Sequence, residues 1–203
     1  MSRVTRLEAD RGRVRVLVDG EEWGEVPAGT LSRWGIREGD EVSPEQLFRY
    51  ERSLAMDRAL RLLSGRDRSR LEICGRLKRF GHHEEVVREV VGRLAEMGYL
   101  DDVSFARRFA RERVGKGYGR ERVLSDLLRR GVGRELAEEA VRREYEGVSD
   151  LEEARVLAAR RYNTGERSDA LARRVHGFLR RRGYQAEVCV LVAREYRGSP
   201  LQR

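Results

Sequence analysis

The sequence predicts a mainly α-helical protein: an elongated array of three tandem three-helix repeats, preceded by a small N-terminal β module. Three helix-like stretches end on a leucine, a short basic cluster and a glycine, at 77–81, 127–131 and 179–183. Further apolar residues recur five and nine places after each glycine. A unit of about 50 residues with apolar positions in register is typical of helical repeats, whose units contact mainly their neighbours. Such an array favours binding of a long partner over chemistry in one pocket.

The first 46 residues are expected to form the β module. Apolar residues alternate with polar ones up to Val18, and Asp19-Gly20 then supplies a strong hairpin signal. A third short strand is expected at 23–26, where it stops before Pro27. Thr30 is predicted to cap a short helix that runs to Trp34, and Gly35 is predicted to close it. The role of this slightly acidic module stays open.

Helical spacing dominates after residue 43. Ser43-Pro44 opens a helix with proline at its first position, and this helix is expected to continue into the first repeat. Ser69 is predicted to cap the second helix, Glu84 to begin the third, and Gly98 to close it. The predicted domains are 1–46 for the β module and 53–103, 104–149 and 150–198 for the three repeats. The predicted helices of the later repeats are 102–114, 119–130, 133–146, 150–162, 167–182 and 184–197.

Charge is unevenly distributed along the chain. The net charge is +8, but residues 1–52 carry 9 basic and 11 acidic groups, whereas residues 53–203 carry 34 and 24. The positive excess of the repeats favours a polyanionic or acidic partner. Arginine suits phosphate, although genome composition explains an arginine bias equally well. With no long apolar segment and no leader-like N-terminus, we expect a cytoplasmic protein without membrane contacts.

Several ordered motifs resemble the RecX family of bacterial RecA regulators. They are Ala59–Ser64, Ser69–Glu72, Gly98–Asp102 followed by Phe105-Ala106, and Gly117–Gly119 followed by Leu127, Leu128 and Gly131-Val132. The resemblance covers roughly residues 53–197, and the third repeat diverges most, around Tyr162–Gly165. The β module is similar to an extension on longer family members.

The resemblance implies a curved array along the groove of the RecA–single-stranded-DNA filament, where it modulates assembly and activity. The implied context is homologous recombination, DNA repair and the SOS response. The implied partners are the RecA filament, single-stranded DNA and double-stranded DNA. We expect the protein to be a monomer. Whether the effect is inhibitory or stimulatory stays open.

Two motifs have both a structural and a functional interpretation. Gly98–Asp102 is interpreted as a helix stop, with Tyr99 and Leu100 packing back and an aspartate capping the next helix, rather than as a metal or acid–base pair. Gly115–Gly119 is interpreted as a link between helices. The alternative is a phosphate site, where amides at the next helix start act with Lys116, Arg120 and Arg122.

We predict no catalytic residues, no cofactor and no metal. His82 and His83 are adjacent in a turn and are expected at the surface or in capping roles, and His176 is isolated. Cys74 and Cys189 are expected as buried free thiols because they lie in apolar-periodic stretches. A nuclease would need a metal-ligand set that the sequence does not show, so we expect a protein that is not an enzyme.

The basic clusters are the candidate binding residues. Charge at a helix C-terminus is explained by the helix dipole at about 0.3–1 kcal/mol per residue, but three clusters in register predict a basic stripe that contacts a partner. A RecA-independent DNA-binding protein or transcription regulator is the alternative, because three-helix units can place a helix in the major groove. The candidates for filament or DNA binding are Lys78, Arg79, Arg107, Arg108, Arg111, Lys116, Arg120, Arg129, Arg130, Arg180, Arg181 and Arg182.

Overall fold

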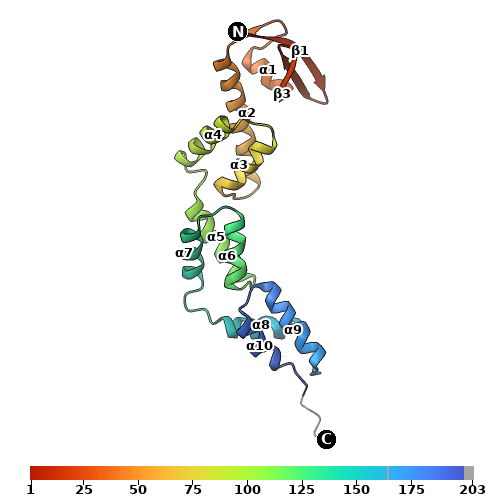
Figure 1. The fold of residues 1–203 in the computed structure, drawn as a ribbon, viewed down its shortest axis with the longest axis vertical. Helices are drawn as coiled ribbons and strands as arrows, with labels where there is room; N and C mark the ends of the chain where they lie inside the picture. The colour runs from red at the N-terminus through yellow and green to blue at the C-terminus, as the bar shows by residue number, and fades with distance from the viewer. Residues whose placement is uncertain (164, 199–203) are drawn as a thin grey trace. The chain divides into compact units, whose positions relative to one another are not determined.

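A computed structural model describes residues 1–163 and 165–198 of the chain. Contacts group the chain into two compact units. The first unit comprises Met1–Arg68 and Ile73–Leu100, and the second comprises Ser69–Glu72 and Asp101–Arg203. The helical prediction is confirmed: a small β module is followed by helices in three groups of three (Figure 1). The four-part domain division stays a prediction.

The β module is a four-stranded antiparallel sheet in the order β3-β2-β1-β4. Its hydrophobic core includes Val4, Val16 and Val26, which are nearly inaccessible to solvent. Asp19 and Gly20 have φ of 53° and 86°, so the expected tight hairpin turn is confirmed. Strand β4 was not predicted, because a two-residue strand is too short to show periodicity. The strands are β1 (Ser2–Asp10), β2 (Arg13–Val18), β3 (Glu21–Pro27) and β4 (Glu41–Val42).

The predicted cap of the short helix is wrong. Helix α1 (Ala28–Trp34) has Pro27 at its N-cap position, and Thr30 is a buried residue inside the first turn. Pro27 presets the backbone for entry to the helix, so the helix starts earlier than the threonine signal indicates. Gly35 closes α1 in the left-handed conformation, as predicted.

The first group of helices is α2 (Pro44–Gly65), α3 (Arg70–Arg79) and α4 (Glu84–Glu96). Ser43 and Gln46 form a reciprocal capping box that starts α2, which confirms the predicted opening. One part of α2 packs in the repeat core through Ala55 and Ala59. Leu54 of the same helix packs in the core of the β module. Helix α2 therefore belongs to both cores of the first unit.

The second unit carries two further groups of helices. Three of these helices start with a side-chain cap, at Asp101 (α5), Ser149 (α8) and Ser168 (α9). Each group encloses its own apolar core. Their ends differ by no more than three residues from the predicted ones. The helices are α5 (Asp102–Gly115), α6 (Arg120–Arg129), α7 (Arg134–Glu144), α8 (Asp150–Arg161), α9 (Asp169–Arg182) and α10 (Ala186–Arg194).

The helix-stop interpretation of Gly98–Asp102 is confirmed for most of its residues. Gly98 has φ of 76°, Leu100 is buried, and Asp101 accepts hydrogen bonds from the amides of Val103 and Ser104. Tyr99 is the exception, because it is 54% exposed instead of packed on the helix end. None of the described helices is long and apolar enough to cross a membrane.

Candidate partner-binding surface

The three basic clusters lie where the repeat predicts them, at the C-terminal ends of the middle helices α3, α6 and α9. In the second unit they are not simply exposed charges. The end of α9 abuts the start of α6: the amide of Gly119 donates to the carbonyl oxygen of Arg182 at 2.8 Å. We call this contact the helix-end joint. It joins the second and third groups of helices through their middle helices.

Glycine is needed on both sides of the helix-end joint. A methyl group added to Gly119 would meet the carbonyl group of Gly183, and one added to Gly183 would meet the backbone and Cβ of Arg122. Gly183 also has φ of 88°, a conformation that side chains with a Cβ rarely adopt. Gly183, which ends the third basic cluster, therefore serves close approach of two backbones as well as helix termination.

The same arrangement recurs at the end of α6. The hydroxyl of Ser69, which caps α3, donates to the carbonyl oxygen of Arg130. A methyl group on Gly131 would meet the side chain of Leu71, and the Arg130 guanidinium pairs with Glu72 at 2.8 Å. These contacts lie inside the second unit, to which Ser69–Glu72 belongs. The basic clusters of α6 and α9 thus have a joining role that neither capping nor partner binding anticipated.

Adjacent arginines in these clusters have different surroundings. Arg130 is 28% exposed and contacts Glu72, whereas Arg129 is 63% exposed and pairs with Asp126 one turn away. In α9, Arg182 donates to the carbonyl oxygen of Lys116, and Arg181 is exposed. Arg130 and Arg182 thus make contacts between helices. Their neighbours Arg129 and Arg181 stay exposed to a partner.

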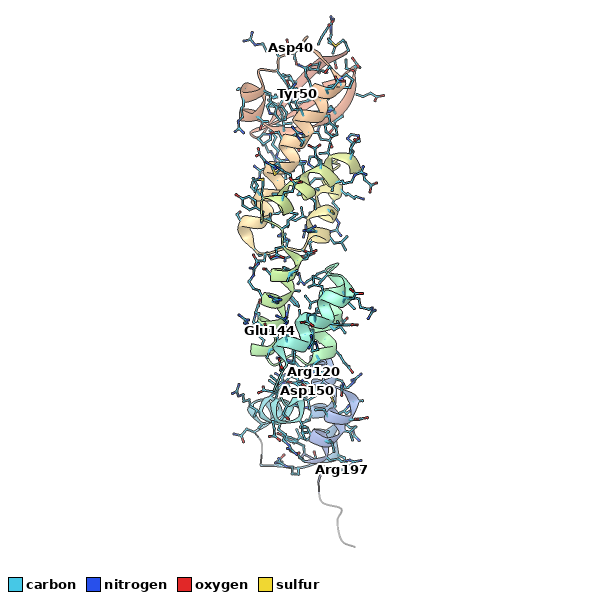
Figure 2. The ribbon with its side chains drawn as sticks, turned by 90° about the vertical axis from the view of Figure 1, so that its left-hand side faces the viewer. Asp40, Tyr50, Arg120, Glu144, Asp150 and Arg197 are labelled. Carbon is cyan, nitrogen blue, oxygen red and sulfur yellow. The ribbon has the colours of Figure 1, made fainter. Side chains whose placement is uncertain are left out.

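At the start of α6, the structure favours a link between helices over the alternative of a phosphate site. Gly119 is occupied by the helix-end joint, and Arg120 turns toward α8, where it lies beside Asp150 (Figure 2). The Nε of Arg120 is 3.1 Å from both carboxylate oxygens of Asp150, and its Nη2 donates to the carbonyl oxygens of Tyr145 and Val148. The Gly119 amide and the Arg120 guanidinium, two of the groups that would hold a phosphate, instead hold the helices of the second unit together.

The structure also assembles a series of alternating arginines and aromatic rings, which we call the arginine–aromatic ladder. Each guanidinium lies 4.7–5.8 Å from the centroid of a ring, a distance typical of cation–π contacts. Consecutive members share a ring or a guanidinium, so the series is continuous across the helix-end joint. Its order is Arg130, Phe109, Arg113, Tyr118, Arg182, Phe178, Arg161, Tyr162 and Arg174.

Most of the ladder's positive charge is not neutralised within the protein. Among the described residues, Arg130 is the ladder arginine with a carboxylate in ion-pair distance. Arg161 and Arg174 are exposed, and the Nε of Arg113 is buried without a hydrogen-bond acceptor. Rings under guanidinium groups and outward N–H edges suit a phosphate-bearing strand. The sequence signal that could have found part of the ladder is the i, i+4 spacing of Phe109 with Arg113 and of Phe178 with Arg182.

Some of the other candidate cations form ion pairs, and others are exposed without one among the described residues. Lys78 pairs with Glu84, Lys116 with Glu112, and Arg180 with Glu121. Arg111 of α5 makes a two-pronged contact with Glu144 of α7, at 3.1 Å for each nitrogen. Arg107 and Arg108 are exposed on α5. For Arg79, Arg107 and Arg181, the described part of the chain contains no ion pair.

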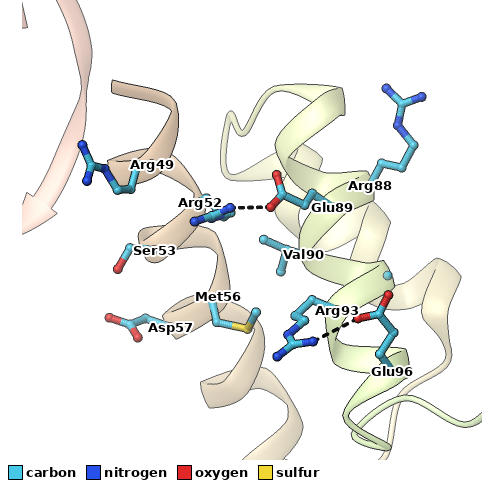
Figure 3. Close-up of a pocket in the computed structure, with 11 residues that line it drawn as sticks. Arg49, Arg52, Ser53, Met56, Asp57, Arg88, Glu89, Val90, Arg93 and Glu96 are labelled. Carbon is cyan, nitrogen blue, oxygen red and sulfur yellow. Dashed lines mark hydrogen bonds and ion pairs between the residues drawn. The ribbon is translucent and has the colours of Figure 1, made fainter. Parts of the chain in front are cut away.

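A groove in the first unit, which the sequence did not indicate, runs between α2 and α4 (Figure 3). Its volume is ≈ 700 Å³, and Met56 and Val90 point into it. Arg52 reaches across to Glu89 at 2.5 Å, and Arg93 pairs with Glu96 at 3.1 Å. Because three carboxylates also line the groove and two of them pair with its arginines, the groove offers less free positive charge than the ladder.

His82 and His83 surround a carboxylate of the first unit. Glu51 of α2 accepts from the amide of His83 at 2.7 Å and contacts the His83 ring at 2.8 Å and the His82 ring at 3.5 Å. Burial alone would raise the pKa of Glu51, but hydrogen bonds from the two histidines outweigh it and lower the pKa to about 2. His82 is 7% exposed, so the expectation of a surface role is wrong for His82.

Within the described residues, no group of three histidine, cysteine or acidic side chains is arranged to hold a metal ion. Neither Cys74 nor Cys189 forms a disulfide with a described residue. Cys189 is buried, as predicted, whereas Cys74 is only half-buried, so the expectation of a buried thiol is wrong there. Burial raises the pKa of the Cys189 thiol, which keeps it protonated and unreactive.

Comparison with known proteins identifies the family. Residues 55–94 match the first three-helix domain of RecX, and residues 101–141 match the second. The regulatory protein RecX of Caldanaerobacter subterraneus is 31% identical over 73% of this chain and 78% of its own length. That of Halorhodospira halophila is 40% identical over 64% of this chain and 81% of its length.

A solved structure supports the same fold. The crystal structure of a regulatory protein RecX has a TM-score of 0.60 and covers 95% of this chain and 98% of its own, at 22% identity. The two matched three-helix domains and the sequence identity to these relatives indicate the same family. The chain therefore belongs to the RecX family of regulatory proteins.

Proposed function

We propose that this protein regulates homologous recombination and DNA repair by binding the RecA–single-stranded-DNA filament along its groove. Binding inhibits filament assembly, ATP hydrolysis by the filament and strand exchange. The protein acts in the cytoplasm, within the SOS response, as a monomer that carries out no catalysis itself. Membership of the RecX family supports the proposal.

The observation that carries the proposal is the arginine–aromatic ladder. A filament presents phosphates and acidic side chains in a repeating series, and a partner must meet several of them in sequence. The ladder provides cations at intervals on a series of rings, and the helix-end joint fixes the ladder's two halves together. Several weak contacts on one joined surface give much tighter binding than any single contact.

The two classes of arginine have different roles in this proposal. Arg120, Arg130 and Arg182 hold the helices of the second unit together. The exposed ladder arginines Arg161 and Arg174 contact the filament. Arg79, Arg107, Arg108 and Arg181 add exposed positive charge, and the cations paired with carboxylates contribute less because a partner must first displace those carboxylates.

The test measures RecA ATPase on single-stranded DNA, with filament length followed by electron microscopy. Substoichiometric amounts of the wild-type protein should lower the ATPase and shorten filaments, without ATP hydrolysis by the protein alone. The double variant R161A/R174A should inhibit less. The matched control R142A/R143A removes two charges from α7, where both arginines pair with Glu139 outside the ladder, and should inhibit like the wild type.

The result that overturns the proposal is unchanged ATPase, filament length and strand exchange at equimolar protein. Tight, sequence-selective binding to duplex DNA without RecA would instead support a RecA-independent DNA-binding protein or transcription regulator. Affinity for duplex and single strands, measured against salt concentration, separates these outcomes.

A further inference from the structure

The first unit contains a cavity where the β module meets the first group of helices. Its volume is ≈ 470 Å³, within the range of small-molecule sites. Strand β3, helix α2 and the turn between α3 and α4 supply its walls. The cavity is lined by Arg13, Glu22, Trp23, Gly24, Glu25, Glu51, Leu54, Arg58, Arg79, Phe80, Gly81, His82 and His83.

Arg58 is the central charge of this cavity, and it is half-buried. Its Nη1 lies 2.8 Å from Nε2 of His82, its Nη2 donates to the carbonyl oxygen of Glu25 at 3.2 Å, and its guanidinium lies over the Phe80 ring at 5.1 Å. An imidazole nitrogen, a carbonyl oxygen and a ring orient the guanidinium, but none of them carries a negative charge. Because arginine only donates, Nε2 of His82 is the acceptor in this contact.

The carboxylates that line the cavity are already engaged. Glu25 pairs with Arg13 at 3.0 Å, and Glu22 pairs with Arg15 at 3.6 Å. Glu51 is held by the two histidines. Within the described part of the chain, no carboxylate lies in ion-pair distance of Arg58. A half-buried cation without a counter-ion is costly, so an anion from solution would be stabilised here.

The surroundings of Arg58 reinforce this electrostatic demand. Burial lowers the pKa of Arg58, and the charges of Arg13 and Arg61 lower it further, which outweighs the opposite effect of the Glu25 carboxylate. Arg79, at the end of α3, is a second cation on the cavity wall that the described residues leave without an ion pair. Both effects favour entry of a negative group.

Aromatic side chains give the cavity a second recognition element. Phe80 is 50% exposed, and Trp23 is partly buried where the wall is formed by β3. Aromatic faces beside arginines are the combination with which proteins bind a base next to its phosphate. Arginine edges match the oxygens of a phosphate group, which they can contact with two N–H groups at once.

We propose that this cavity binds a phosphate group, held by Arg58 and Arg79, with Trp23 and Phe80 available to stack on an attached base. The site is separate from the ladder, and it adds a ligand to the protein beyond filament binding. The phosphate could belong to free inorganic phosphate, to a nucleotide or to the backbone of a single strand. The experiment below distinguishes these sources.

The test is isothermal titration calorimetry of the full chain, without RecA. The probes are inorganic phosphate, adenosine monophosphate, adenosine and a short single-stranded oligonucleotide, all at one chloride concentration. The phosphate-bearing probes should bind saturably, and adenosine should bind at least about tenfold more weakly than adenosine monophosphate. Equal affinity of inorganic phosphate and the nucleotide assigns the site to free phosphate. Tighter binding of the nucleotide or the oligonucleotide assigns it to that source.

Matched variants localise the binding. R58Q should weaken phosphate binding at least about tenfold. R49Q, on the same helix but outside this cavity, should bind like the wild type. If R58Q fails to fold, R79Q serves instead, because Arg79 is exposed and is expected to be dispensable for folding. The proposal is overturned by an absence of saturable binding at millimolar phosphate and nucleotide, by equal binding of adenosine, or by equal losses in R58Q and R49Q. Because RecA is absent, none of these results bears on filament regulation.

Discussion

The amide nitrogen of Gly119 lies 2.8 Å from the carbonyl oxygen of Arg182, and this hydrogen bond joins the start of α6 to the end of α9. Both groups belong to helix ends, where backbone donors and acceptors lack partners inside their own helix. The joint lets each end satisfy the other, with the positive end of one helix dipole against the negative end of the next. It explains why glycine is needed at positions 119 and 183.

The substitution G119A should destabilise the second unit. The added methyl group would meet the carbonyl of Gly183, so the two helix ends must separate. We expect a loss of about 1–3 kcal/mol in the free energy of unfolding, as for other overpacked sites. Urea unfolding followed by circular dichroism measures it. The control G133A also changes a glycine at an N-cap, but with open space around it, and should cost only roughly 0.5 kcal/mol. Equal losses in the two variants would contradict the joint.

Arg130 and Arg129 should differ in their effect on stability. R130A removes the ion pair with Glu72 and the stacking on Phe109, and we expect a loss of about 1–3 kcal/mol. R129A removes an exposed guanidinium from buried Asp126, which keeps its ion pair with Arg122, and should cost about 0.3–0.5 kcal/mol. The sequence alone predicted a small cost for both. Chemical unfolding of the two single variants measures the loss in the free energy of unfolding. A loss in R130A no larger than in R129A would refute the joining role of Arg130.

Glu51 should give the first unit a specific acid sensitivity. Its pKa falls from an ordinary 4.5 to about 2 in the folded protein, so its ionised form stabilises the fold above pH 4.5 and this contribution disappears as the pH falls toward 2. E51Q should therefore be less stable at neutral pH and should lose less stability between these pH values. Unfolding curves across this range test it. The control E89Q removes a carboxylate that pairs across the α2–α4 groove, and an equally flattened curve there would argue against a special role for Glu51.

The exposed end of the ladder should control the salt dependence of binding. If Arg161 and Arg174 each contact one phosphate, R161A/R174A should reduce the slope of log affinity against log salt by about 1.4 on single-stranded DNA. Fluorescence anisotropy at several salt concentrations measures the slope. R142A/R143A serves as the matched control, with an unchanged slope. An unchanged slope in a folded R161A/R174A variant would leave the ladder a purely structural feature.

The sequence by itself determined the order, number and approximate ends of the helices. These depend on local features that a chain carries in its residue order: the capping box at Ser43, the carboxylate cap at Asp101, the left-handed stop at Gly98 and the spacing of apolar residues. The repeat was visible for the same reason. The predicted cap at Thr30 was wrong because Pro27 starts the helix earlier. Strand β4 was missed because two residues are too few to show a pattern.

Only the tertiary structure decided which arginines face inward. Arg129 and Arg130 are neighbours with the same chemistry, yet one pairs with Asp126 three residues away and the other with Glu72, 58 residues away. The ladder and the Arg58 cavity likewise combine side chains from several helices or from a strand and a helix. Helical periodicity predicts which face of its helix a residue occupies. Packing between elements decides which residue of another element lies opposite that face, and no local sequence pattern encodes this packing.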